Sequence, residues 1–201
     1  MPSALAKNYG LTMLSPVRRE NGVLAALGAA LRGIPDGAES PWARLPMVHL
    51  ARFAVIEDLP YVSRGKSGVH PRRAPELLRR PYLMFTADLD GRRDDFLDAV
   101  CLEVPDFLER VWGFCEGFPG TEYTVWWRKW AVACEIETTF FFADYPGRSV
   151  EEVLRALMAR QALVDFHVAH QDADPATLRA DYRALMADLR RAPTPARGGP
   201  T

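Results

Sequence analysis

The sequence predicts an α+β fold in which short strands alternate with amphipathic helices and further helices follow near the C-terminus. Two patterns lead to this prediction. Short apolar runs rich in β-branched and aromatic residues indicate strands, and apolar residues at helical spacing separate them. Proline and glycine mark most of the boundaries between these segments. With 201 residues, we expect a single domain over residues 1–191 and a disordered, Pro/Gly/Ala-rich tail over 192–201.

Four segments have the composition of strands. The first ends near Pro16, the second follows a proline-bounded loop, the third stops at Asp90-Gly91, and the fourth precedes a Tyr-Pro-Gly turn. A long basic segment separates the second strand from the third. It runs from Tyr61 to Arg80 and predicts a long loop. The predicted strands are Leu11–Val17, Met47–Glu57, Tyr82–Asp88 and Thr138–Asp144.

Helices are predicted between and after these strands. The first covers about Arg19–Arg32, and a second helical stretch after Asp94 should break or kink at Pro105. The aromatic segment Thr121–Cys134 fits a helical face, although its composition also suits a strand. Two C-terminal helices begin with recognisable caps: Ser149 with Glu152 forms a capping box, and Asp174 precedes a proline at the first helical position.

Composition excludes several classes of protein. The chain is 48% hydrophobic and has a net charge of −1, whereas nucleic-acid binders usually carry a basic excess. No stretch is long and apolar enough to span a membrane, and the N-terminus lacks a signal-peptide pattern. Three widely spaced cysteines form no CxxC pair, which argues against disulfides and structural zinc. We therefore expect a cytoplasmic protein without nucleic-acid or membrane partners.

The predicted order β-α-β-β-α-β, with extra C-terminal helices, is the split βαβ plan of a ferredoxin-like domain. The segment LTMLSPVRRENGVLAALGAAL resembles the first strand and helix of the dimeric α/β-barrel superfamily, and HLARFAVIE with YLMFTADLDG resembles its next strand pair. This resemblance covers about residues 10–165. It implies a ferredoxin-like sheet that pairs with a second copy, and activities of the monooxygenase or peroxidase type. Some members bind haem through a histidine, so haem is the cofactor to test.

Three polar residues on the predicted strands are candidates for catalysis. His49 can act as a base or hydrogen-bond donor near neutral pH, or can simply bond a loop carbonyl. Strict alternation places His49 on one face of its strand and Arg52 on the opposite face. Arg52 needs an acidic partner, either Asp88 or Glu57 in a salt bridge or an acidic substrate. Asp88, near Asp90, suits acid–base chemistry but also suits an ordinary turn.

Aromatic residues between Val111 and Trp130 suggest a ligand-binding wall. Pockets for planar ligands are lined by aromatic side chains with few polar groups, although core packing is the ordinary role of such residues. The break at Gly117–Gly120 allows close backbone approach, and Glu116 could serve as an acid or base. Cys115 is a much weaker candidate, because a nucleophilic thiol needs a nearby base. The predicted ligand-binding residues are Trp112, Glu116, Tyr123, Trp126 and Trp130.

Two functions follow from these features. The first is a small-molecule enzyme, expected to be an oxidoreductase acting on an apolar planar substrate. The second is a non-catalytic ligand-binding or homodimeric assembly module that uses the same sheet. Fold alone does not decide between them. A homodimer is expected in either case, because a sheet with one uncovered apolar face must bury it somewhere.

Overall fold

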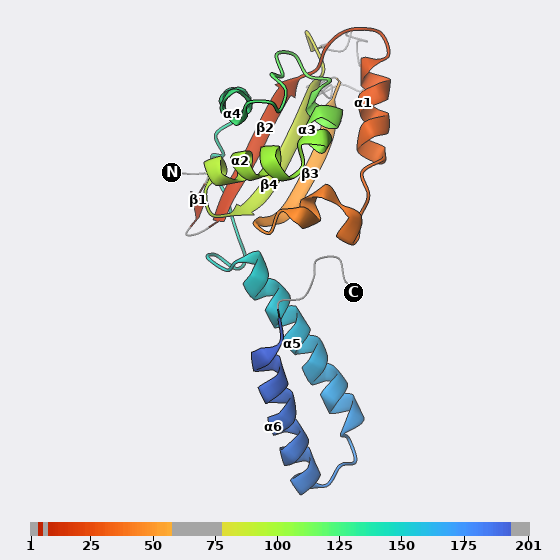
Figure 1. Cartoon of the computed structure of the whole chain (residues 1–201), viewed down its shortest axis with the longest axis vertical. Coiled ribbons are helices and arrows are strands. Elements are labelled where there is room, and N and C mark those ends of the chain that lie inside the picture. The colour runs from red at the N-terminus through yellow and green to blue at the C-terminus, as the bar shows by residue number, and fades with distance from the viewer. Residues whose placement is uncertain (1–3, 6–7, 58–77, 194–201) are drawn as a thin grey trace, which may run out of the picture.

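The computed structural model describes residues 4–5, 8–57 and 78–193 of the chain. Most of the predicted basic loop (58–77) and of the predicted tail (194–201) lies outside these residues. The chain forms an α+β body followed by two long helices (Figure 1). In order, the elements are β1 (Ala4–Leu5), β2 (Asn8–Pro16), α1 (Val23–Arg32), the 3-10 turns η1 (Gly37–Glu39) and η2 (Pro41–Arg44), β3 (Val48–Ile56), β4 (Tyr82–Asp90), α2 (Arg93–Glu103), α3 (Pro105–Trp112), α4 (Thr124–Ala133), α5 (Val150–Ala169) and α6 (Pro175–Arg191).

Three long antiparallel strands make the sheet, in the order β2-β4-β3, and the two-residue β1 pairs with the start of β2. The first three predicted strands are therefore present. The ferredoxin-like prediction is wrong, however, because its fourth strand is missing: Thr138–Asp144 is irregular chain. A sheet of this kind is not the sheet of a dimeric α/β barrel.

Local pairing explains why Thr138–Asp144 does not become a strand. The preceding residues meet the outer edge of β2 through a single bridge between Met13 and Glu135, with Ile136 N–H donating to the Thr12 carbonyl. At Thr138 the side-chain hydroxyl, rather than the backbone, donates to the Gly10 carbonyl. The Phe141 ring then lies 2.8 Å from the position that a Cβ on Gly10 would take, so the chain passes over the surface of the sheet at Gly10 instead of extending the sheet.

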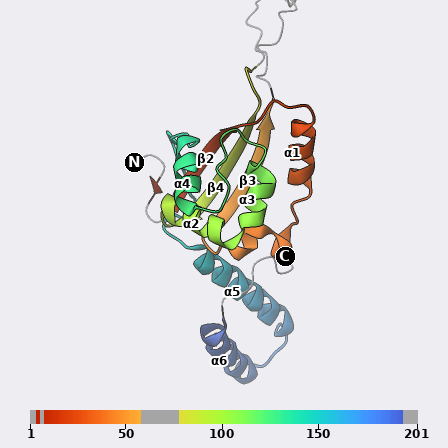
Figure 2. The ribbon, with the colours of Figure 1, turned by 45° about the horizontal axis from the view of Figure 1, so that its top comes forward.

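One face of the sheet carries the hydrophobic core. On β4, Leu83, Phe85, Ala87 and Leu89 are all buried and alternate with half-buried residues, as a half-covered strand requires. Helices α2, α3 and α4 cover this face, and α1 lies beside β3 (Figures 1 and 2). Aromatic rings fill the centre of the core: Trp42 stacks on Phe85 with ring centroids 5.3 Å apart, and Phe53, Phe107 and Trp112 surround them.

None of the helices in the described residues covers the opposite face of the sheet, here called the open face (Figures 1 and 2). Its two halves differ in chemistry. Toward the end of β2 it is apolar, and toward the start of β2 it carries Thr12, Arg52, Thr86 and Asp88. The apolar half consists of Leu14, Ala54, Ile56, Tyr82 and Met84.

The predicted helices are present, although α1 begins at Val23 and not at Arg19. Pro105 separates α2 from α3, the aromatic segment forms α4, and the Ser149–Glu152 capping box opens α5. Asp174 caps α6 through the N–H groups of Ala176 and Thr177. Among the described helices, none is both long and apolar enough to cross a membrane.

Helices α5 and α6 form a hairpin that projects away from the body (Figures 1 and 2). The Phe166 ring stacks on His170 at 4.1 Å between centroids and meets the edge of Tyr182 at 5.9 Å. The His170 ring also bonds the Phe166 carbonyl at 2.8 Å and the Asp181 carboxylate at 3.0 Å. These two acceptors raise the pKa of His170 above its ordinary value.

We expect Phe85→Ala to lower the free energy of unfolding by about 3–5 kcal/mol, because it opens a cavity in the aromatic centre of the core. Urea denaturation measures the change. Leu102→Ala is the matched control, since Leu102 is 70% exposed on α2 and its loss should cost less than about 0.5 kcal/mol. Equal losses in the two variants would contradict this description of the core.

The hairpin should be more stable in mild acid than at neutral pH. A raised pKa in the folded state means that protonated His170 stabilises the hairpin below about pH 6.5, and that this contribution is lost as pH rises through the raised value. The Asp174 cap, whose pKa is lowered by its bonds to Thr177 and Ala176, stays ionised over that range. Amide exchange of α6 between about pH 5 and 8 should show the trend in wild type but not in His170→Gln. An identical trend in both proteins would exclude His170 as its source.

Candidate functional site

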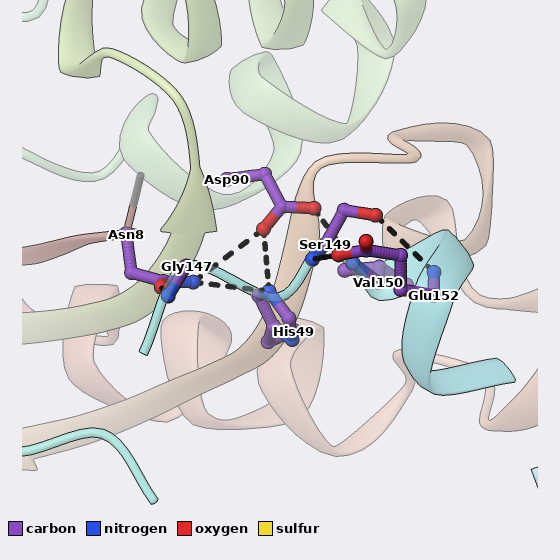
Figure 3. Close-up of polar contacts among 7 residues, drawn as sticks. All are labelled: Asn8, His49, Asp90, Gly147, Ser149, Val150 and Glu152. Carbon is purple, nitrogen blue, oxygen red and sulfur yellow. Dashed lines mark hydrogen bonds and ion pairs between the residues drawn. The ribbon is translucent and has the colours of Figure 1, made fainter. Parts of the chain in front are cut away.

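A cluster of polar side chains surrounds His49, at the start of β3 (Figure 3). A β-bulge between Val48 and Leu50 shifts the alternation of the strand. Val48 stays buried under the core, and the His49 ring turns to the Asp90 carboxylate, with Nε2 2.7 Å from Oδ1. Asp90 lies on the open face, two residues after Asp88 on β4, and His49 turns toward it. The prediction that His49 and Arg52 lie on opposite faces is therefore wrong.

Asp90 joins three separate parts of the chain. Its Oδ1 accepts from His49 and, at 3.5 Å, from the Asn8 side-chain amide, while Oδ2 accepts from the Val150 N–H at 2.7 Å. The buried Asn8 in turn accepts the Gly147 N–H at 2.7 Å. Val150 is the first residue of α5, so the carboxylate also lies at the positive end of that helix. We call Asn8, His49 and Asp90 the Asp90 cluster.

The tautomer of a neutral His49 ring follows from these bonds. An ionised carboxylate only accepts hydrogen bonds, so Nε2 carries the proton that it shares with Asp90. In the neutral ring Nδ1 is then the acceptor, and no described residue donates to it. The ring is held in one orientation by a carboxylate, as in many acid–base and ligand-binding histidines.

A shallow groove of about 310 Å³ adjoins the cluster, between the 3-10 turns, β3 and the first turns of α5. Its walls are mostly apolar, and His49 and Ser40 supply the polar side chains. Trp42, which also stacks on Phe85 in the core, is the largest side chain in the lining. The remaining lining residues are Gly37, Ala43, Val48, Ala51, Val150 and Leu154.

The other two catalytic candidates lie on the open face, outside this groove. The Arg52 guanidinium donates through Nε to the Thr86 hydroxyl at 3.1 Å and has no ion pair with a described residue. Asp88 lies between Gly10 and Leu50 on the neighbouring strands. The carboxylate that pairs with His49 is thus Asp90 and not Asp88, while the predicted salt bridge of Arg52 with Asp88 or Glu57 is not formed.

The predicted ligand-binding aromatics do not line one pocket. Trp112 is buried in the core, and Trp130 packs on Phe118 while its Nε1 donates to the Glu116 carbonyl. Tyr123 and Trp126 are more than half exposed on the outer side of α4, with the Lys129 ammonium 4.9 Å from the Trp126 ring. The space expected between the sheet and Val111–Trp130 is filled by core side chains.

Glu116 and the cysteines are not brought to the groove either. The Glu116 carboxylate pairs with Arg80 at the other end of the sheet, beside Arg18 and Arg19. Burial raises the pKa of the Cys115 thiol to about 12, so it stays protonated and is a poor nucleophile at neutral pH. The pKa values of Cys101 and Cys134 are also raised by burial. No group of three metal-ligating side chains occurs within the part of the chain that the structure describes.

Sequence reasoning missed two residues of this site. Asn8 precedes the predicted first strand, and nothing in its neighbourhood marks it as a partner of residues 90 and 147. Trp42 lies in a proline-bounded loop, where a single tryptophan is not part of the apolar spacing that marks a helix or a strand. Asp90 was visible as a turn residue after a strand, but its bond to the first residue of a helix sixty positions away was not.

Comparison with known proteins identifies no relative. No family model matches the chain, and no curated protein or solved structure shows significant similarity to it.

Asp90→Ala should lower the free energy of unfolding by about 1.5–3 kcal/mol, the range for hydrogen bonds to a charged group. It leaves His49 and the Val150 N–H without their acceptor, so amide exchange in the first turn of α5 should also accelerate. Asp88→Ala is the matched control on the same strand. The Asp88 side chain has no hydrogen bond or ion pair with a described residue, so this variant should stay within about 0.5 kcal/mol of wild type. Similar effects of the two substitutions would refute the bridging role of Asp90.

Proposed function

We propose that the protein binds a small, mostly apolar molecule with one polar group, in the groove between Trp42 and His49. The observation that carries the proposal is the His49–Asp90 pair on the wall of an otherwise apolar groove. Ligand sites commonly combine apolar walls with a few oriented polar groups. The groove brings a histidine and a large aromatic side chain together in one lining.

Each part of the groove has a distinct role in this proposal. The Trp42 ring, fixed by its stacking on Phe85, offers a flat surface to an apolar or planar body. His49 Nδ1 accepts a hydrogen bond from a hydroxyl or N–H group of the ligand. Asp90 holds the imidazole in place, so little rotamer entropy is lost on binding.

Catalysis requires one step more than binding. A histidine oriented by a carboxylate can accept a proton from a bound ligand as a general base. Oxidoreductase activity and haem binding, which were expected from the resemblance, stay predictions. The geometry favours binding as the function to test first, because the other two predicted catalytic residues do not reach the groove.

Binding can be tested with a planar apolar probe, 8-anilinonaphthalene-1-sulfonate, and with native mass spectrometry of the purified protein for a retained ligand. We expect Ala43→Phe, which fills the groove, to weaken probe binding at least about tenfold, since one aromatic side chain occupies much of the available volume. His49→Gln should weaken a hydrogen-bonded ligand by about tenfold, corresponding to one hydrogen bond.

Ala26→Phe is the matched control for this experiment. Ala26 is exposed on α1 and lines none of the described pockets, so the added ring should leave binding unchanged. Circular dichroism confirms that each variant is folded. If Ala43→Phe binds the probe as tightly as Ala26→Phe does, the groove is not the site.

A further inference from the structure

The groove beside His49 lies between two parts of the molecule. On the side of the body, the 3-10 turns contribute Trp42 and Ala43 to its lining, and β3 contributes His49. On the side of the hairpin, the lining consists of Val150 and Leu154, in the first two turns of α5. A molecule bound in the groove therefore contacts the body and the base of the hairpin at the same time.

The hairpin has little buried surface of its own against the body. Among the described residues of the hairpin, 150–191, Val150 alone is buried, and the others are half-buried or exposed. Its base is held by the Val150 N–H, which donates to Asp90, and by the preceding Gly147 N–H, which donates to Asn8. Both helices then project away from the body (Figures 1 and 2). Because elements with few buried contacts open at a low free-energy cost, we expect the hairpin to detach more readily than the core strands separate.

One carboxylate connects the groove with the hairpin. Asp90 Oδ1 lies 2.7 Å from Nε2 of His49, on the groove wall, and Oδ2 accepts the Val150 N–H at 2.7 Å (Figure 3). The bond that orients the imidazole and the bond that anchors α5 therefore share one group. If the hairpin detaches, Oδ2 loses its donor and the groove loses the side chains of Val150 and Leu154.

We propose that a ligand in the groove holds the base of the hairpin on the body, so that occupancy of the groove and attachment of the hairpin are coupled. This inference rests on the proposed function and concerns how that same site is regulated. A ligand shifts a conformational equilibrium only by the difference in its affinity for the two states. Here the difference comes from the contacts with α5, which exist only while the hairpin is attached. By reciprocity, an attached hairpin strengthens binding in the groove.

Of the two hairpin residues in the lining, Leu154 has more free surface for a ligand. Val150 is only 8% exposed, so most of its side chain is already covered by the protein. Leu154 is half-buried and lies one turn farther along α5. We therefore expect the coupling to depend on Leu154 and not on Leu157, which is 54% exposed and lies outside the lining.

Hydrogen–deuterium exchange of the full chain measures the coupling, with 8-anilinonaphthalene-1-sulfonate as the probe at about ten times its Kd. If the first two turns of α5 open only when the groove is empty, the probe should slow the exchange of their amides about tenfold. The amides of α6, which does not line the groove, are the control within the same molecule and should change less than about twofold. Unchanged exchange in α5, or equal slowing in α5 and α6, would overturn the coupling.

A pair of substitutions tests the reciprocal effect. Leu154→Ala should weaken probe binding at least about threefold, because it removes apolar surface that the ligand buries, and at the same probe concentration it should reduce the slowing in α5. Leu157→Ala is the matched control, since it makes the same change on the same helix outside the lining, and it should alter neither quantity. Equal effects of the two substitutions would show that Leu154 does not contact the ligand and would overturn the coupling.

The variants at Ala43 and Ala26 separate failure of this inference from failure of the proposed function. If Ala43→Phe weakens probe binding and Ala26→Phe does not, while exchange in α5 is unchanged by the probe, the ligand site stands and the coupling is wrong. If the two variants bind the probe equally, the probe does not occupy the groove, and both proposals are wrong. Any slowing in α5 should be absent from Ala43→Phe, because its groove is filled.

Discussion

The arrangement of this protein depends on one carboxylate, that of Asp90. It lies at the end of the central strand, where it accepts hydrogen bonds from the neighbouring strands through His49 and Asn8 and from the first N–H of α5. Charge-assisted bonds to an ion at a helix N-terminus are among the stronger polar contacts available to a protein surface. The same group therefore closes one end of the sheet, orients His49 and determines where the helical hairpin leaves the body.

Two properties follow from this junction. The imidazole of His49 is presented to a groove with its orientation already fixed, which is the basis of the proposed ligand site. The hairpin is directed away from the sheet (Figure 1). A ligand that contacts Val150 and Leu154 would lie against the base of the hairpin.

Local patterns predicted most of the elements correctly, because apolar alternation and helix caps each depend on residues only a few positions apart in the sequence. The capping box at Ser149 and the break at Pro105 are examples. The strand predicted at Thr138–Asp144 is absent for the opposite reason. Its composition suits a strand, but a strand also needs the edge of another strand to pair with, and the chain leaves the edge of β2 after Thr138. For His49, the bulge that turns its ring leaves no mark on the sequence. The pairing of Asp90 with Val150 joins residues sixty positions apart, which no local pattern can indicate.

The central claim is that Asp90 fixes the hairpin relative to the sheet. Spin labels at Leu102 on α2 and Arg179 on α6, both exposed, measure this directly by pulsed dipolar spectroscopy, with excess unlabelled protein so that only distances within one chain contribute. We predict one narrow distance distribution in the wild-type background and a broad one when Asp90→Ala is added. A distribution that is already broad in the wild-type background, or one that Asp90→Ala leaves unchanged, would contradict the claim.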